Sequence, residues 1–244
     1  MLIPAYFSPG AGGAVWADMC QRIRNSLAVS LIIMNPPDNG HFTTAEAKYR
    51  DGMVACHLRG QSVIAYVDTD YGAIDLADVK ANVDDYLRLY PGIRGVFFDQ
   101  VPNYPTPEHT LAWYSMYYKT LADYVHQRLP GAKVVANAGG SAPTAWQFNP
   151  PIADILVNFE QTYAKFTTWS PKAWVSGYPS ERFAHLIYET PVDATRAACD
   201  MSERKHARWV FVTAAQYGVD LWKRVPSAEM IACRSLYRRT VIAP

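Results

Sequence analysis

Short apolar runs alternate with longer segments of helical or loop character along the whole chain, and this alternation constrains the fold more than any other feature. Helical periodicity is clear in places, as where Leu76, Val79, Val83 and Leu87 recur every three or four residues. Eight runs are apolar enough to be buried strands: residues 2–7, 27–34, 63–68, 95–100, 133–137, 155–160, 183–188 and 209–213. Eight strand units in 244 residues predict a (β/α)8 barrel of the TIM type, with residues 1–244 as one domain.

An open, doubly wound sheet is the alternative fold that the same alternation allows. Such sheets commonly bind a dinucleotide at a glycine-rich loop after the first strand. Gly10, Gly12 and Gly13 follow the first predicted strand, but they do not form G-x-G-x-x-G, and no acidic residue closes the next strand. The barrel is therefore favoured, and we expect no cofactor.

The charge of the chain is close to neutral. The formal net charge is +1, and the short stretch at residues 234–239 is the one run rich in arginine. A chain with so small a net charge has no strong positive electrostatic potential that would attract nucleic acid. No apolar run approaches the roughly 20 residues of a membrane span. We expect neither nucleic acid nor membrane as a partner, and we expect a monomer. The 16 tyrosines and 7 tryptophans favour flat ligands such as sugars.

The four cysteines, Cys20, Cys56, Cys199 and Cys233, all fall in predicted helices. They lack the close spacing of metal or redox motifs, so we expect buried thiols. Neighbouring helices in a ring could nevertheless bring Cys20 near Cys56, or Cys199 near Cys233, within bridging distance. Residues 1–7 lack the basic start and long apolar core of a signal peptide, which predicts a cytoplasmic chain or a trimmed mature form.

Residues 95–102 contain the polar strand end around which the predicted site is arranged. Val96, Phe97 and Phe98 form a buried strand that Asp99 and Gln100 terminate. A carboxylate at such a place must be hydrogen-bonded, paired or used, because burying it alone costs several kcal/mol. A turn-capping aspartate is the simpler interpretation of the same residue.

Polar residues end most of the other predicted strands as well. A barrel collects all of these ends on one face. The residues are Tyr6, Asn35, Asp68, Asp99, Gln100, Asn137, Glu160, Glu189 and Thr213, with Tyr66, Tyr71, Tyr163 and Tyr188 beside them. Paired carboxylates next to flat rings are what glycoside hydrolysis requires. The sequence therefore predicts a sugar site at this face.

Other chemistries have weaker support. The six histidines have no i, i+4 or His-x-His partner, so we expect no metal site. The chain also lacks the G-x-S-x-G elbow of esterases and a phosphate loop.

Taken in order, short motifs along the chain resemble the spherulation-specific (spherulin-4-like) family of glycoside hydrolases. The residues that carry the resemblance are Tyr6 with Trp16, Asn35 before Pro36, Tyr66 with Thr69 and Gly72, Asp99 after Phe98, Asn137 with Gly139, Glu160 after Phe159, Tyr188 after His185, and Thr213 after Val212. The resemblance implies a barrel enzyme, typically secreted or at the cell surface. It also implies a polysaccharide or oligosaccharide substrate with α-1,4-linked N-acetylgalactosamine or galactosamine, as in galactosaminogalactan.

The resemblance further implies that Asp99 and Glu160 match the catalytic carboxylates of the family. Asp99 would be the nucleophile or the group that stabilises the sugar cation, and Glu160 the general acid and base. The chain departs from the family at Gln100, where the family has Glu, and at Ala214, where an Asp commonly follows the Thr. A carbohydrate-binding barrel without hydrolysis is therefore the alternative, with Tyr66, Tyr71, Tyr163 and Trp169 as stacking platforms.

Overall fold

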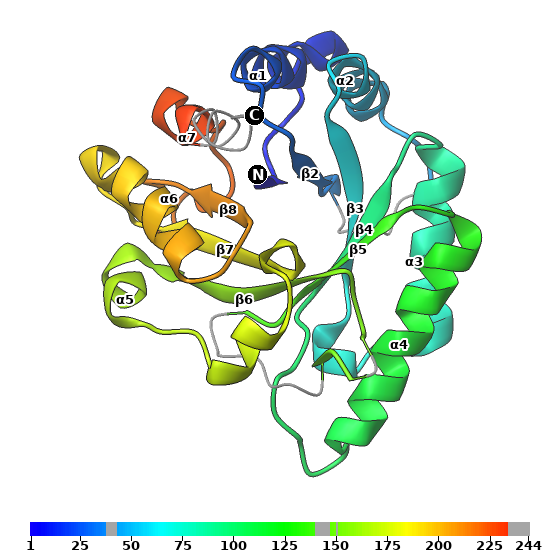
Figure 1. The fold of residues 1–244 in the computed structure, drawn as a ribbon. Coiled ribbons are helices and arrows are strands. Elements are labelled where there is room, and N and C mark those ends of the chain that lie inside the picture. The colour runs from blue at the N-terminus through cyan, green and yellow to red at the C-terminus, as the bar shows by residue number, and fades with distance from the viewer. Residues whose placement is uncertain (38–42, 140–146, 150, 234–244) are drawn as a thin grey trace, which may run out of the picture.

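The computed structural model describes residues 1–37, 43–139, 147–149 and 151–233, and its eight strands form one parallel sheet in sequence order. The strands are β1 (Leu2–Ala5), β2 (Leu31–Met34), β3 (Ser62–Asp68), β4 (Gly95–Asp99), β5 (Lys133–Asn137), β6 (Ile155–Thr162), β7 (Phe183–Tyr188) and β8 (Trp209–Val212). The sheet curls until β8 lies next to β1 (Figure 1). The predicted (β/α)8 barrel is confirmed.

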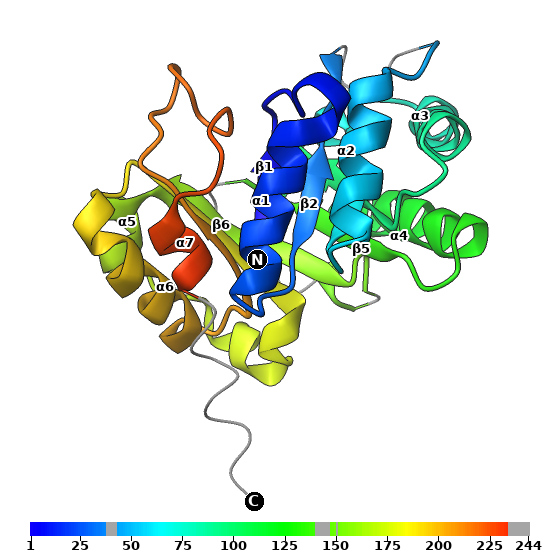
Figure 2. The same ribbon diagram turned by 90° about the horizontal axis from the view of Figure 1, so that it is seen from above.

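Helices surround the sheet on its outer side, as Figures 1 and 2 show. The α-helices are α1 (Ala14–Asn25), α2 (Ala47–His57), α3 (Leu76–Leu89), α4 (Leu111–Arg128), α5 (Tyr163–Thr168), α6 (Thr195–Arg204) and α7 (Ala228–Ala232). Short 3-10 turns lie between them: η1 (Ala11–Gly13), η3 (Asp70–Gly72), η5 (Ala173–Gly177), η6 (Ser180–Arg182) and η7 (Val192–Ala194). The strands are buried because helices cover one face and opposing strands the other.

Several predicted strand boundaries differ from the structure. The second strand begins at Leu31 rather than at residue 27, because Leu27 has a φ of 58° and lies in the turn that ends α1. Helix α4 begins at Leu111, where Thr110 caps it by accepting a hydrogen bond from the Trp113 amide. The basic stretch at residues 234–239 lies outside the described residues.

The cysteines form two disulfides, so the expectation of buried thiols is wrong. Cys20 of α1 is bonded to Cys56 of α2 across a Cα–Cα distance of 5.2 Å. Cys199 of α6 is bonded to Cys233, directly after α7, across 6.1 Å. Both distances are ordinary for a disulfide. The reason lies in the ring of helices, which places α1 beside α2 and α6 beside α7 (Figure 2).

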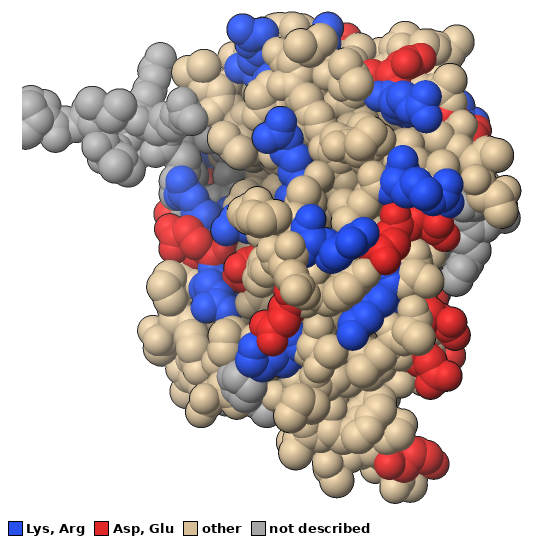
Figure 3. Space-filling view, turned by 90° about the vertical axis from the view of Figure 1, so that its right-hand side faces the viewer, with Lys and Arg blue, Asp and Glu red and all other residues tan. Residues whose placement is uncertain are grey.

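The outer surface over α3 and α4 carries charges of both signs. On the face shown in Figure 3, lysine and arginine side chains lie close to aspartate and glutamate side chains. Arg128 of α4 pairs with Asp84 of α3 at 2.9 Å, and Lys119 pairs with Asp123 at 2.6 Å. Among the described residues, no helix is long and apolar enough to cross a membrane.

Candidate active site

A cleft of about 490 Å³ opens at the C-terminal ends of the strands. Asp99 ends β4, Asn137 ends β5, and Glu160 lies near the end of β6. All three side chains line the cleft, because parallel strands of a barrel deliver their ends to one face. This is the face on which the sequence predicts the site.

A bulge in β6 sets the direction of Glu160. The register against β7 runs from Val157–Ala184 directly to Phe159–His185, so Asn158 is an extra residue. Side chains alternate along a regular strand, and one extra residue reverses the alternation after it. Phe159 thereby packs against Phe166 and Trp169 of the helical layer, while Glu160 lines the cleft.

Asn137 holds the two carboxylates at a fixed spacing. Its Nδ2 donates to Asp99 Oδ1 and to Glu160 Oε2, each at 2.7 Å. The two accepting oxygens are therefore at most about 5.4 Å apart, twice that distance. The Gly139 amide donates to Asn137 Oδ1 at 3.0 Å, which fixes the amide so that its two protons face the carboxylates.

Asp99 is held by donors from three sides. The Tyr66 hydroxyl, the Asn137 amide and the Gln100 backbone N–H all donate to its carboxylate, and each lowers its pKa. Burial acts in the opposite direction and is the largest effect, so the pKa of Asp99 lies above its ordinary value. The three donors fix the orientation of the Asp99 carboxylate in the lining of the cleft.

Glu160 has its pKa raised to about 7. Burial is the main cause, and the neighbouring charge of Asp99 raises the pKa further. Hydrogen bonds from Asn137 and from the Trp222 indole oppose this rise by stabilising the ionised form. A carboxyl group that titrates near neutrality can donate a proton and later accept one.

Gln100 faces the same cleft as Asp99 because the strand ends between them. Its φ of 56° lies in the left-handed region, so it leaves the pleat of β4. Its Nε2 donates to Asp68 Oδ2 at 3.4 Å. Asp68 pairs in register with Asp99 on the neighbouring strand, and its charge also raises the pKa of Asp99.

Aromatic rings border the cleft. Tyr71, Tyr104 and Tyr217 line it and are 53%, 59% and 73% exposed. Tyr188 is buried and stacks on Tyr217 with ring centres 6.1 Å apart. Exposed rings at a polar cleft offer platforms for the apolar faces of sugars.

The structure distributes the remaining predicted site residues around the cleft. Tyr6 lies in edge contact with Tyr66, 5.5 Å between ring centres. Burial is the main cause that raises the pKa of both hydroxyls, and the nearby charge of Asp99 raises it further. Seven predicted residues are not among the described residues that line the cleft: Tyr6, Asn35, Tyr66, Asp68, Tyr163, Glu189 and Thr213. Thr213 accepts from the Ala215 amide at 3.1 Å, and Glu189 accepts from the Tyr217 amide at 3.2 Å, so both hold turns. Trp169 packs on Phe159 and is likewise absent from the lining.

Several residues of the lining were not predicted as site residues. They are Val101, Pro102, Asn103, Tyr104, Ala138, Gly139, Gln161, Tyr217 and Leu221, and Trp222 reaches Glu160 from the loop after β8. Most lie in loops, where the periodicity of strands and helices gives no signal. Tyr104 could have been noticed as a large ring in a segment rich in Pro and Asn, and Tyr217 as a large ring next to Gly218.

No group of three or more His, Cys, Asp or Glu side chains suited to a metal ion occurs in the part of the chain that the structure describes.

The sequence profile of spherulation-specific family 4 matches residues 1–232. Spherulin-4 of Physarum polycephalum is 28% identical over 195 residues. That alignment covers 78% of this chain and 55% of spherulin-4, so the chain spans about half the length of this relative.

Solved structures share the barrel. Sph3 of Aspergillus clavatus, in complex with GalNAc, has a TM-score of 0.79 at 19% identity, covering 96% of both chains. A chitinase of Rhizomucor miehei has a TM-score of 0.56 at 12% identity, covering 88% of this chain and 94% of its own. A GH5_18 protein of Streptomyces cattleya, in complex with GlcNAc, has a TM-score of 0.53 at 11% identity, covering 100% and 80%. At these identities the likeness establishes the fold.

Proposed function

The chain belongs to spherulation-specific family 4, and on that premise we propose that it is a glycoside hydrolase that uses Asp99 and Glu160 on α-1,4-linked N-acetylgalactosamine or galactosamine polymers. The observation that carries the proposal is the pair of carboxylates joined through Asn137 at the floor of an aromatic-rimmed cleft. Sph3, whose crystal structure contains GalNAc, supports the sugar class.

Glu160 is the general acid in this proposal. Its pKa of about 7 leaves it protonated below neutrality, so it can protonate the leaving glycosidic oxygen. After the bond breaks, the same carboxylate can take a proton from water. Asn137 and the Trp222 indole donate to it and stabilise the ionised form that results.

Asp99 acts on the sugar carbon as nucleophile, or it stabilises the cationic transition state. Retaining enzymes have carboxyl groups about 5 to 5.5 Å apart, whereas inverting enzymes need about 6.5 to 9.5 Å for an intervening water. The bound of about 5.4 Å between the oxygens that share Asn137 supports retention. NMR of the first product formed would show the retained anomer if this assignment holds.

The two disulfides support an oxidising compartment, so we propose a secreted or cell-surface protein. A polysaccharide substrate outside the cell fits that location. A monomer remains our expectation.

The decisive experiment incubates the protein with partly deacetylated α-1,4-galactosaminan and identifies products by mass spectrometry. We expect shorter oligosaccharides, and a loss of at least about 10² in rate for both Asp99→Asn and Glu160→Gln. Circular dichroism of each variant controls for folding. Equal product formation by folded variants and parent would remove these residues from the mechanism.

A carbohydrate-binding barrel without hydrolysis is the second candidate function. The observation that favours it is Gln100, an amide at the mouth where the family has a Glu. In that case the same incubation yields no products, while the oligosaccharide still binds. Asp99→Asn would then leave the affinity nearly unchanged.

A further inference from the structure

A second cleft of about 490 Å³ lies at the opposite end of the barrel from the candidate active site. We call it the basal cleft and define it by Lys119, Asp123, Lys133, Asp154, Glu181 and Trp209. Lys133 is the first residue of β5, and Asn137 is the last. At about 3.3 Å per residue, the two ends of this strand are roughly 13 Å apart, so the basal cleft is a separate site.

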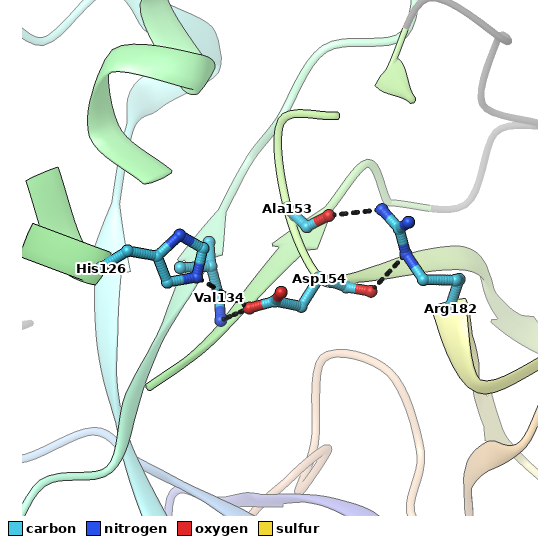
Figure 4. Close-up of polar contacts among 5 residues, drawn as sticks. All are labelled: His126, Val134, Ala153, Asp154 and Arg182. Carbon is cyan, nitrogen blue, oxygen red and sulfur yellow. Dashed lines mark hydrogen bonds and ion pairs between the residues drawn. The ribbon is translucent and has the colours of Figure 1, made fainter. Parts of the chain in front are cut away.

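One wall of the basal cleft is held rigid by a network of hydrogen bonds (Figure 4). Arg182 donates to the Asp154 and Ala153 carbonyls at 2.7 and 2.8 Å. Asp154 Oδ2 accepts from the Val134 amide at 2.8 Å and lies 3.0 Å from His126 Nε2. The network joins α4, β5, β6 and η6, so the wall is formed before any ligand arrives.

Several polar groups of the basal cleft are left for a ligand. The exposed Lys133 ammonium makes no ion pair with any described residue. Glu181 receives a single side-chain contact, a long hydrogen bond of 3.4 Å from Ser180, within the described part of the chain. The Trp209 indole N–H donates to the Glu181 carbonyl at 3.0 Å, which fixes a half-buried ring in the lining.

The charges of the lining select against strongly charged ligands. Three cationic residues, Lys119, Lys133 and Arg182, are matched by three acidic residues, Asp123, Asp154 and Glu181. The three acidic side chains would repel a polyanion, and the two lysines and the arginine would repel a polycation. A neutral ligand with many hydroxyl groups can use both signs, because hydroxyls both donate and accept. An indole in the same lining favours a ligand with an apolar face.

We propose that the basal cleft is a second saccharide-binding site, which holds part of a sugar polymer away from the active-site cleft. Pyranose rings combine an apolar face with neutral hydroxyl groups, and the basal cleft combines Trp209 with balanced charges. Binding at two ends of one barrel would raise the local concentration of a long polymer at the active site. The proposal rests on the proposed function only for the choice of polymer.

The test is calorimetric titration of the full chain carrying Glu160→Gln, with a soluble α-1,4-N-acetylgalactosamine oligosaccharide as the probe. We expect two sites, one of which is weakened about tenfold when Trp209→Ala removes the ring. Lys133→Gln provides a second variant, because its exposed side chain has no ion-pair partner to lose. Lys172→Gln, at an exposed position outside the basal cleft, is the matched control and should bind as the parent does.

Measurements of turnover distinguish a failure of this inference from a failure of the proposed function. In the protein with its native Glu160, Trp209→Ala should slow cleavage of the long polymer. The rate of cleavage of a short soluble oligosaccharide should be unchanged. Two-site binding without any hydrolysis would refute the proposed function and support the basal cleft. Normal hydrolysis with one binding site, unchanged by both Trp209→Ala and Lys133→Gln, would overturn the inference.

Discussion

Gln100 stands where the resemblance implies a glutamate in the family, and its backbone explains how it shares a cleft with Asp99. Side chains next to each other on a regular strand face opposite sides. The left-handed φ of Gln100 ends β4 and turns its amide toward Asp68. Such a conformation of a non-glycine residue destabilises the folded state by about 1 to 3 kcal/mol, and strained residues of this kind are common at functional sites.

We predict that Gln100→Glu changes turnover by less than about tenfold, because Asp99 and Glu160 already provide the two carboxylates of the mechanism. A glutamate would add a charge near Asp99 and lose the donor to Asp68. Initial rates on the galactosaminan polymer measure the effect, with Gln161→Glu as a control for a new charge on the lining. A gain of about a thousandfold would show that the acid belongs at position 100.

Trp222 affects the pKa of Glu160, the proposed acid, although no sequence pattern indicated this residue. Its indole donates to Glu160 and lowers the pKa of the carboxyl, against the larger effect of burial. Its ring packs edge-on against Tyr188, and its carbonyl accepts from the Tyr6 amide at 3.1 Å. One residue thus joins the loop after β8 to both β1 and Glu160.

We predict that Trp222→Phe moves the alkaline limb of the pH–rate profile upward. In the proposed mechanism, activity requires protonated Glu160, so the rate should fall as the pH rises through about 7. Phenylalanine keeps most of the ring but removes the N–H that stabilises the ionised form, which raises the pKa by about one unit. Trp113→Phe, on the exposed start of α4, is the control and should leave the limb in place. A downward shift in Trp222→Phe would contradict the assigned hydrogen bond.

At the scale of elements, apolar runs predicted every strand because burial on both faces demands them. The predicted strand at residues 183–188 coincides with β7, and the one at 133–137 with β5. The bulge at Asn158 was not predictable, since one extra residue leaves an apolar run unchanged while it redirects Glu160. Loop residues such as Tyr217 and Trp222 were missed because their positions depend on contacts between distant segments. The disulfides were missed for a related reason, because only the closed ring decides which helices are neighbours.

We predict that Gly95→Ala destabilises the junction of β4 and β5. A methyl group at Gly95 would collide with the backbone carbonyl of Lys133 and press on Ile64. The backbone of Lys133 is held in the ladder between β4 and β5 and cannot move aside without strain. We therefore expect the free energy of unfolding to fall by about 1 to 3 kcal/mol. Urea unfolding measures it.

Gly177→Ala is the matched control for that experiment. Nothing lies within 4 Å of the methyl group it would add, and its backbone is not left-handed, so stability should hardly change. If both variants unfold at the same urea concentration, the close approach of β4 to β5 is not a constraint on this barrel.

At the scale of the whole molecule, the barrel closes where β8 meets β1, and described contacts there include the hydrogen bond from Tyr6 to Trp222. Successive strands from β1 to β8 are instead joined by ladders of paired residues. The two disulfides lie on either side of this closure. Cys20–Cys56 ties α1 to α2, and Cys199–Cys233 ties α6 to the end of α7.

The last prediction follows from that placement. The disulfides join residues 36 and 34 positions apart, and chain-entropy arguments assign roughly 4 kcal/mol of stabilisation to loops of such length. Replacing Cys199 and Cys233 together by alanine should therefore lower the free energy of unfolding by a few kcal/mol. It should also speed hydrogen exchange in α7, because a helix of five residues depends on contacts outside itself for its stability.

The Cys20→Ala, Cys56→Ala pair is the control for this experiment. It removes a similar loop, so unfolding should be affected to a similar degree, but exchange in α7 should stay slow because Cys199–Cys233 remains. Urea unfolding and exchange measured by mass spectrometry on all three proteins separate the two effects. If the loss of Cys199–Cys233 leaves α7 protected, then packing of Met230 and Ile231 against the barrel, rather than the crosslink, holds this side of the closure.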